Sequence, residues 1–212
     1  MNLDYSILVN KNNGIDEKFV NETVVPNLVR TESIKNNNVV FDTFKIKERV
    51  NFLEKETYKN FRELQNYCKK NGVILDITSG YLSFEQQKAK YDYFVKSKGI
   101  EFAKKSACLA GYSEHNTGLC LDCDLFINGK WCGIALNKDG CINNQTAWLH
   151  TILHKFGFIL RYPKGKENIT NMKFEPWHIR YVGNDLAKYL YENKLTLEEY
   201  HQQKIKTNTE VQ

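Results

Sequence analysis

The fold of this chain depends on one stretch, Ser113-Glu114-His115-Asn116-Thr117-Gly118-Leu119-Cys120-Leu121-Asp122. From Leu119 onward apolar and polar residues alternate, which predicts a half-buried strand over residues 119–126. One face of this strand carries Leu119, Leu121, Cys123 and Leu125, and the other carries Cys120, Asp122, Asp124 and Phe126. His115 precedes the strand in a loop, where Gly118 permits a bend. Such a bend would allow His115 to fold back over Asp122.

Patterns on either side of this strand predict both helices and strands. Asn128-Gly129 is a strong hairpin signal, so residues 131–136 are expected to return as an antiparallel partner. Apolar residues recur at helical spacing over residues 47–70, and Ser83-Phe84-Glu85-Gln86 resembles a capping box that opens the next helix. Further strands are expected over residues 73–78, 158–163 and 178–182, and further helices over residues 147–156 and 185–193.

The length of 212 residues fits one domain. We expect an irregular lead-in over residues 1–45 that packs on the domain, a core over residues 46–200, and a polar, mobile tail over residues 201–212. The net charge of +5 is spread along the chain, and no nucleic-acid-binding module is recognisable, so no nucleic-acid partner is expected. No signal peptide or membrane-spanning run is recognisable, which predicts a cytoplasmic location, with release to the cell wall by lysis or removal of a leader as the alternatives.

The six cysteines are expected to be reduced, because no secretory signal accompanies them. Cys120 and Cys123 have the spacing of a metal knuckle, which Cys132 and Cys141 could complete as a structural zinc site. Against this alternative, Cys120 and Cys123 are an odd number of residues apart on the predicted strand, so their side chains should point to opposite faces.

A second motif, Glu175-Pro176-Trp177-His178, follows about fifty residues later. Two histidines and one carboxylate can supply three ligands to zinc and leave a fourth position open, as in catalytic sites. His115, Asp122 and His178 offer that set, and Glu175 is a spare carboxylate for a general base. On spacing alone the alternatives stay open: a surface histidine, a hydrogen-bonded aspartate, a core Trp177 and an exposed Glu175.

Together these motifs resemble the zinc-dependent D-alanyl-D-alanine carboxypeptidases of the VanY type, including the related D,D-dipeptidases. The resemblance rests on Ser113-x-His115-x-x-Gly118-x-Cys120-x-Asp122, on Glu175-Pro176-Trp177-His178-Ile179-Arg180-Tyr181-Val182-Gly183, and on Ser79-Gly80-Tyr81 with Gln86. It implies a single α+β metallopeptidase domain with a small antiparallel sheet flanked by helices.

The resemblance also implies the roles of the site residues. Zinc (Zn2+) would be held by His115, Asp122 and His178, with Glu175 as the general base toward a zinc-activated water. Ser113, Tyr81 and Gln86 would contact the substrate. Asp124, on the same strand face as Asp122, would help to orient a ligand.

This sequence departs from the family pattern at two positions. Leu82 stands where the family usually has an arginine that binds substrate or stabilises the oxyanion, and Arg180 or Arg161 is a candidate to replace it. Cys120 stands where alanine is common, so a thiol is expected beside the metal, where it could be oxidised or compete as a ligand.

The predicted function is hydrolysis of a D-alanyl-D-alanine or related peptidoglycan peptide bond. Two alternatives accompany it: a peptidoglycan endopeptidase that uses the same site, and a non-catalytic module that binds cell-wall peptides. The second alternative is motivated by Leu82, which can donate no side-chain hydrogen bond to an oxyanion.

Overall fold

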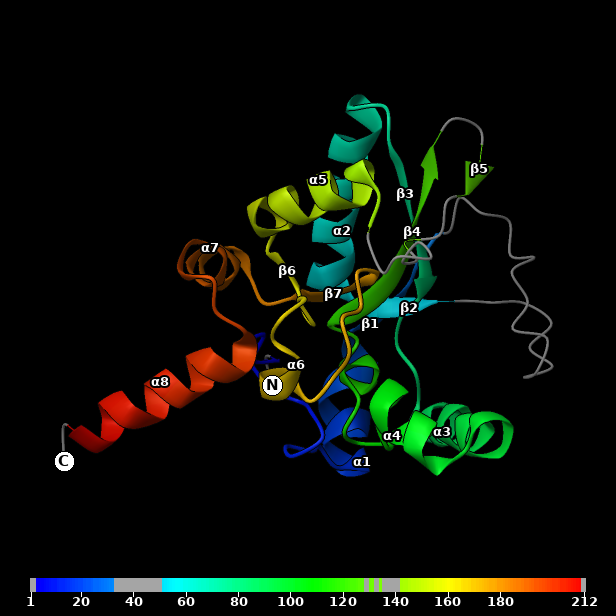
Figure 1. Ribbon diagram of the computed structural model, residues 1–212, viewed down its shortest axis with the longest axis vertical. Helices are drawn as coiled ribbons and strands as arrows, with labels where there is room; N and C mark the ends of the chain where they lie inside the picture. The colour runs from blue at the N-terminus through cyan, green and yellow to red at the C-terminus, as the bar shows by residue number, and fades with distance from the viewer. Residues whose placement is uncertain (1–2, 33–50, 128–129, 132–133, 135–141, 211–212) are drawn as a thin grey trace.

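Strand β4 (Cys120–Ile127), the strand that the alternating sequence predicts, pairs with three other strands. The computed structural model describes residues 3–32, 51–127, 130–131, 134 and 142–210. Within them a five-stranded antiparallel sheet has the order β3-β4-β7-β6, with β5 paired to β4 (Figure 1). The other strands of this sheet are β3 (Ile74–Ser79), β5 (Lys130–Trp131), β6 (Phe158–Leu160) and β7 (His178–Tyr181).

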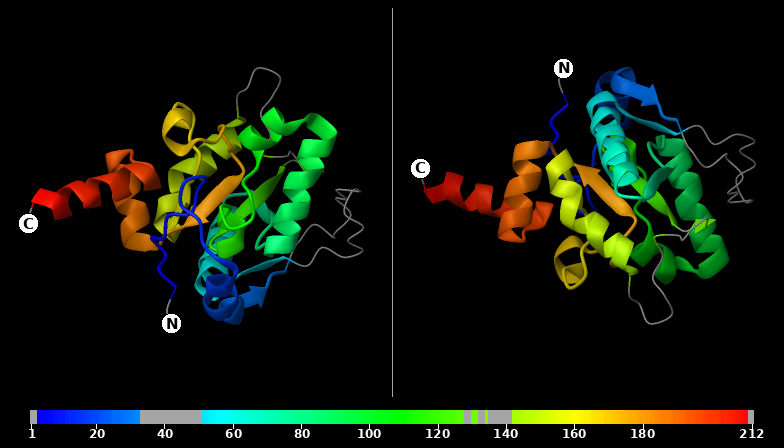
Figure 2. Two further views of the ribbon diagram at one scale, coloured as in Figure 1. Left: turned by 90° about the horizontal axis from the view of Figure 1, so that it is seen from below. Right: turned by 90° about the horizontal axis from the view of Figure 1, so that it is seen from above.

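One face of the sheet is covered by α2 (Lys55–Lys70) and α5 (Asn144–Ile152), as Figure 2 shows. The apolar face of β4 packs there, because Leu121, Cys123 and Leu125 belong to the same buried cluster as Phe61 and Leu149. Since this face is closed by helices, the polar side chains of β4 face the other side of the sheet.

The remaining elements lie on that other side, at the edges of the sheet or, in the case of residues 153–156, beside α2 and α5. β1 (Leu28–Arg30) and β2 (Phe52–Glu54) form a separate two-stranded antiparallel pair. The rest are helices and single turns: α1 (Glu17–Phe19), η1 (Val20–Val24), η2 (Val25–Asn27), α3 (Phe84–Lys98), α4 (Ile100–Ser106), η3 (Glu114–Thr117), η4 (Leu153–Phe156), α6 (Glu167–Thr170), α7 (Asn184–Asn193) and α8 (Leu197–Glu210).

The structure confirms the α+β fold with its antiparallel sheet flanked by helices. The capping box at Ser83 is present, with the Ser83 hydroxyl accepting from the Gln86 N–H and the Gln86 side chain accepting from the Ser83 N–H. β5 returns antiparallel to β4, although Asn128 and Gly129 themselves lie outside the described residues.

Several predicted boundaries differ from the structure; the strand expected over residues 158–163, for example, ends at Leu160. The helix expected over residues 47–70 begins only at Lys55, because the residues just before it form β2, which pairs with β1. Helix α8 runs through residues 197–210, so most of the segment expected as a tail over 201–212 is helical. Figures 1 and 2 show α8 projecting away from the sheet; its mobility stays a prediction.

Among the described helices, none combines the length and the apolar character that crossing a bilayer requires.

Candidate metal centre

The backbone brings His115, Asp122 and His178 together from three elements. His115 lies in the single turn η3, which ends at Gly118 with φ +68°. A Cβ at that position would come within 2.7 Å of Leu28 Cδ2, so glycine suits both the conformation and the space. Asp122 and His178 are direct partners across the antiparallel strands β4 and β7. The loop therefore folds back over the strand pair, as the sequence predicts.

The carboxylate oxygens of Asp122 lie close to a nitrogen of each histidine. His178 Nδ1 lies 3.1 Å from Asp122 Oδ1, and His115 Nε2 lies 3.6 Å from Asp122 Oδ2. Ligands at about 2.0–2.2 Å from a tetrahedral zinc stand roughly 3.3–3.6 Å apart. The Asp122 carboxylate thus contacts both imidazoles, one through each of its oxygens, as expected of a residue that would share a zinc ion with them.

The second nitrogen of each imidazole is already engaged, which fixes the nitrogen that faces the centre. His115 Nδ1–H donates to Gly80 O at 2.7 Å, so Nε2 is left to coordinate. His178 Nε2 lies 3.4 Å from Glu114 Oε2, so Nδ1 is left to coordinate. Partners of this kind, a carbonyl and a carboxylate, orient metal-binding histidines in general.

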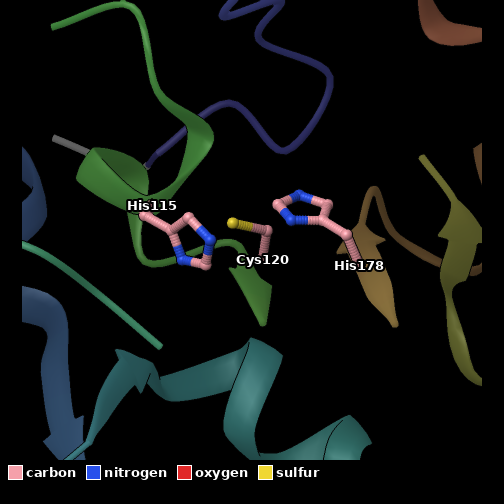
Figure 3. Close-up of side chains that lie close together, drawn as sticks. All are labelled: His115, Cys120 and His178. Atoms are coloured by element: carbon pink, nitrogen blue, oxygen red, sulfur yellow. The ribbon is translucent and has the colours of Figure 1, made fainter. Parts of the chain in front are cut away.

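Cys120 lies between the two imidazoles, as Figure 3 shows. Ligand atoms of His115, Cys120 and His178 all lie within 4.8 Å of one another, and the thiol is fully buried. Burial acts to raise the pKa of the Cys120 thiol, but His115 and His178 lower it by more. The pKa therefore lies below its ordinary value. The two histidines are therefore shared by two possible donor sets, one completed by Asp122 and the other by Cys120.

Glu175 stands beside the donors rather than among them. Its Oε2 lies 4.0 Å from His178 Nδ1, and its side chain is 14% exposed. The backbone of the turn holds it there, since the Glu175 N–H donates to Tyr162 O and the His178 N–H donates to Glu175 O. Burial raises the pKa of Glu175 above its ordinary value, although His178 acts in the opposite direction.

The Asp122 carboxylate and the neighbouring imidazoles shift one another's pKa values. Burial acts to raise the pKa of Asp122, but His115 and His178 hold it well below its usual range, so the carboxylate is ionised. Burial acts to lower the pKa of His178, but Cys120 and Asp122 raise it well above the ordinary value of histidine. A metal ion that binds here would replace protons on imidazole.

Beneath the metal centre lies a buried ionic network that the sequence analysis did not predict. Glu114 Oε1 accepts from Arg161 Nε at 2.7 Å and from Arg180 Nη1 at 2.6 Å. All three side chains are fully buried. One feature of the sequence pointed to such a network: Arg180 stands between Ile179 and Tyr181 in a predicted strand. A charge that is buried there requires a partner.

The residues predicted to contact substrate occupy different surroundings. Arg180 is buried and donates to Glu114, Tyr5 O, Ile7 O and Tyr181 O, which favours a supporting role under the site. Gln86 is engaged in the capping box of α3, and Ser113 is buried at the start of η3. Tyr81 is half-buried, and burial raises its pKa. The substrate roles of Arg180, Gln86, Ser113 and Tyr81 stay predictions.

The metal-knuckle alternative does not fit the described cysteines. Cys120 faces the histidines, whereas Cys123 lies in the apolar cluster under the helices and its thiol donates to Trp177 O at 3.2 Å. Their side chains therefore point to opposite faces, as the odd spacing predicts. Cys132 and Cys141 lie outside the described residues.

Two histidines, an aspartate and an adjacent glutamate are residues that catalytic zinc sites of hydrolases use in general. The model of the VanY D-alanyl-D-alanine carboxypeptidase family matches residues 50–184, and the chain belongs to this family. The predicted family is thereby confirmed.

Relatives of known sequence support the same family. YodJ of Bacillus subtilis (strain 168) is 39% identical over 158 residues, covering 74% of this chain and 56% of YodJ. The D-alanyl-D-alanine carboxypeptidase of Enterococcus faecium is 35% identical over 182 residues, covering 81% of this chain and 54% of that protein. The chain thus spans about half the length of these two relatives.

Solved structures share the fold. The LdcB LD-carboxypeptidase superposes with a TM-score of 0.72 at 35% identity, covering 92% of this chain and 84% of that one. The vancomycin-resistance D,D-pentapeptidase VanY, solved in complex with Zn(II), superposes with a TM-score of 0.69 at 27% identity, covering 93% and 99%.

Proposed function

We propose that this chain is a zinc-dependent carboxypeptidase that removes a terminal D-alanine from peptidoglycan peptides. The observation that carries the proposal is the position of Glu175, 4.0 Å from the coordinating nitrogen of His178 and outside the set of three donors. A carboxylate placed there can act on a water or a substrate at the open side of the centre.

His115 Nε2, Asp122 and His178 Nδ1 would hold the zinc. When bound, zinc supplies Lewis-acid polarisation of the scissile carbonyl and lowers the pKa of a water. Glu175 accepts a proton from the attacking water and delivers it to the amine nitrogen that leaves as free D-alanine. Burial makes Glu175 a stronger base than an exposed glutamate, because it raises the pKa of its carboxyl group.

A second candidate concerns the configuration of the residue before the cleaved bond. Relatives named as D,D-enzymes and relatives named as L,D-carboxypeptidases superpose on this chain to a similar degree, with TM-scores of 0.69 for VanY and 0.72 for LdcB. The D,D-peptide is our first choice, because the matching family model is that of a D-alanyl-D-alanine carboxypeptidase.

Product analysis tests the proposal. Zinc-loaded protein is incubated with a pentapeptide that ends in D-alanyl-D-alanine, with the tetrapeptide that ends in L-lysyl-D-alanine, and with the free D-alanyl-D-alanine dipeptide. D-Alanine from the pentapeptide supports the D,D-activity, and D-alanine from the tetrapeptide alone selects the L,D-activity. Internal cuts in cross-linked muropeptides would instead indicate an endopeptidase, and peptide binding without turnover a non-catalytic module.

The cytoplasmic location stays a prediction.

A further inference from the structure

The buried ionic network under the metal centre continues to the C-terminal helix. Arg161, which donates to Glu114, also forms two parallel hydrogen bonds to Glu198 in α8, from Nη1 at 2.8 Å and from Nη2 at 2.7 Å. Glu198 Oε1 further accepts from Asn10 Nδ2 at 3.1 Å. A continuous path therefore runs from Glu198 through Arg161 and Glu114 to Nε2 of His178.

This path consists of charges with almost no contact to water. The side chains of Arg161 and Glu114 are fully buried, and that of Glu198 is 6% exposed. With Arg180, the network holds two cations and two anions, so its charges balance. Removing one partner of a buried ion pair leaves the other uncompensated, which is strongly destabilising.

The contact of Glu114 with His178 is the longest in this path. Glu114 Oε2 lies 3.4 Å from His178 Nε2, whereas its other oxygen binds the two guanidinium groups at 2.6 and 2.7 Å. The arginines therefore fix where the Glu114 carboxylate lies. If Arg161 lost Glu198, its guanidinium would draw more strongly on Glu114, and the weaker contact with His178 would change first.

We propose that Glu198 is a positioning residue of the metal centre, which aligns the coordinating nitrogen of His178 through Arg161 and Glu114. Glu198 lies beyond the residues that the family model matches, 50–184, so this support comes from a part of the chain outside the matched domain. The inference rests on the proposed metal site, but it requires neither a particular substrate nor turnover.

The test measures zinc affinity in the absence of peptide. Glu198→Gln keeps the shape of the side chain and removes its charge. We expect the zinc dissociation constant of this variant to be about 10–100-fold higher than that of the parent, as for other residues that hydrogen-bond to metal ligands. It is measured by competition with a chelating dye, well below the unfolding temperature. Glu199→Gln is the matched control on the same helix. Glu199 accepts hydrogen bonds from Lys166 Nζ and from the Thr196 N–H, neither of which belongs to the network. Its zinc affinity should stay within about twofold of the parent.

A double-mutant cycle separates positioning from general stability. If the path acts as a unit, adding Glu198→Gln to Glu114→Gln should weaken zinc binding less than Glu198→Gln does alone. Glu198→Asp retains the charge but is too short to keep both bonds, and we expect a smaller loss of zinc affinity. This variant also serves if Glu198→Gln does not fold.

Several results would overturn the inference. Parent-like zinc affinity in folded Glu198→Gln would show that Glu198 does not position the metal centre. If that variant does not fold, the same result in folded Glu198→Asp would show it. If the effects of Glu198→Gln and Glu114→Gln on zinc binding simply add, Glu198 does not act through Glu114. A parent that binds no zinc would remove both the metal site and its support, whereas zinc binding without peptide cleavage would reject the proposed function alone.

Discussion

Asp122 and His178 stand directly opposite each other across β4 and β7, with His178 Nδ1 3.1 Å from Asp122 Oδ1. The strand register thus sets this contact between residues 56 positions apart. A slip of one residue would turn Asp122 into the apolar cluster that holds its neighbours Leu121 and Cys123. The sheet therefore fixes two of the three donors, and the loop that carries His115 brings the third.

Loss of the aspartate should abolish tight zinc binding. Asp122→Asn keeps the volume but removes the negative charge that contacts both imidazoles. We expect zinc affinity to fall by more than the roughly 10–100-fold typical of outer partners. Zinc per protein after dialysis measures the effect. His154→Gln is the control, since His154 stacks on Tyr191 instead of facing the centre; zinc retention in Asp122→Asn at the parent level would contradict the assignment.

The two possible donor sets make opposite predictions for Cys120. If Asp122 completes the set, Cys120→Ala keeps zinc within a few-fold of the parent, and the cobalt-substituted parent lacks the near-ultraviolet absorption of thiolate-to-cobalt charge transfer. We predict this result, because the ionised carboxylate of Asp122 contacts both imidazoles. A strong charge-transfer band that disappears in Cys120→Ala would instead make Cys120 a ligand.

Activity should fall as the pH drops through the raised pKa of Glu175. Burial raises this pKa, and the base form that accepts the proton is therefore lost at a higher pH than for an ordinary glutamate near about 4.3. The acidic limb of kcat/KM should lie above that value. Zinc content is measured across the same pH range, because protonation of the histidines would also release metal. An acidic limb that follows zinc loss would contradict the role of Glu175.

An arginine at position 82 should raise turnover. The Leu82 N–H donates to His115 O at 3.0 Å, and Leu82 O accepts from Asn116, so the backbone here is bound to the loop of the metal centre. Restoring one donor for the oxyanion is worth up to about 10²-fold in rate, so we expect kcat to rise at least severalfold in Leu82→Arg. Ile205→Arg adds the same charge at an exposed position of α8 and should change nothing. Unchanged kcat in folded Leu82→Arg would mean that the site does not use a cation there.

Local sequence patterns were sufficient to predict the elements that carry the site. The alternation after Gly118 predicts β4 and the inward face of Asp122, and the capping box predicts the start of α3. Such signals are local, since strand period, turn chemistry and helix caps depend on neighbouring residues.

The supporting network could not be predicted in this way. Glu114 accepts hydrogen bonds from Arg161 and Arg180, which lie 47 and 66 positions away in the sequence. Arg161 donates to Glu198, which lies 37 positions away. No periodicity links such positions, and only the packed sheet and the docking of α8 bring them together. The same holds for Arg180, which the sequence offered as a substrate contact and the structure surrounds with Glu114 and backbone carbonyls.

The role of Glu175 is tested most directly by D-alanine release from the pentapeptide, compared between the zinc-loaded parent and Glu175→Gln at equal zinc content. We expect turnover by the parent, and a loss of at least about 10²-fold in kcat in Glu175→Gln, with zinc still bound. D-Alanine release at the same rate from both proteins, or from neither, would contradict it.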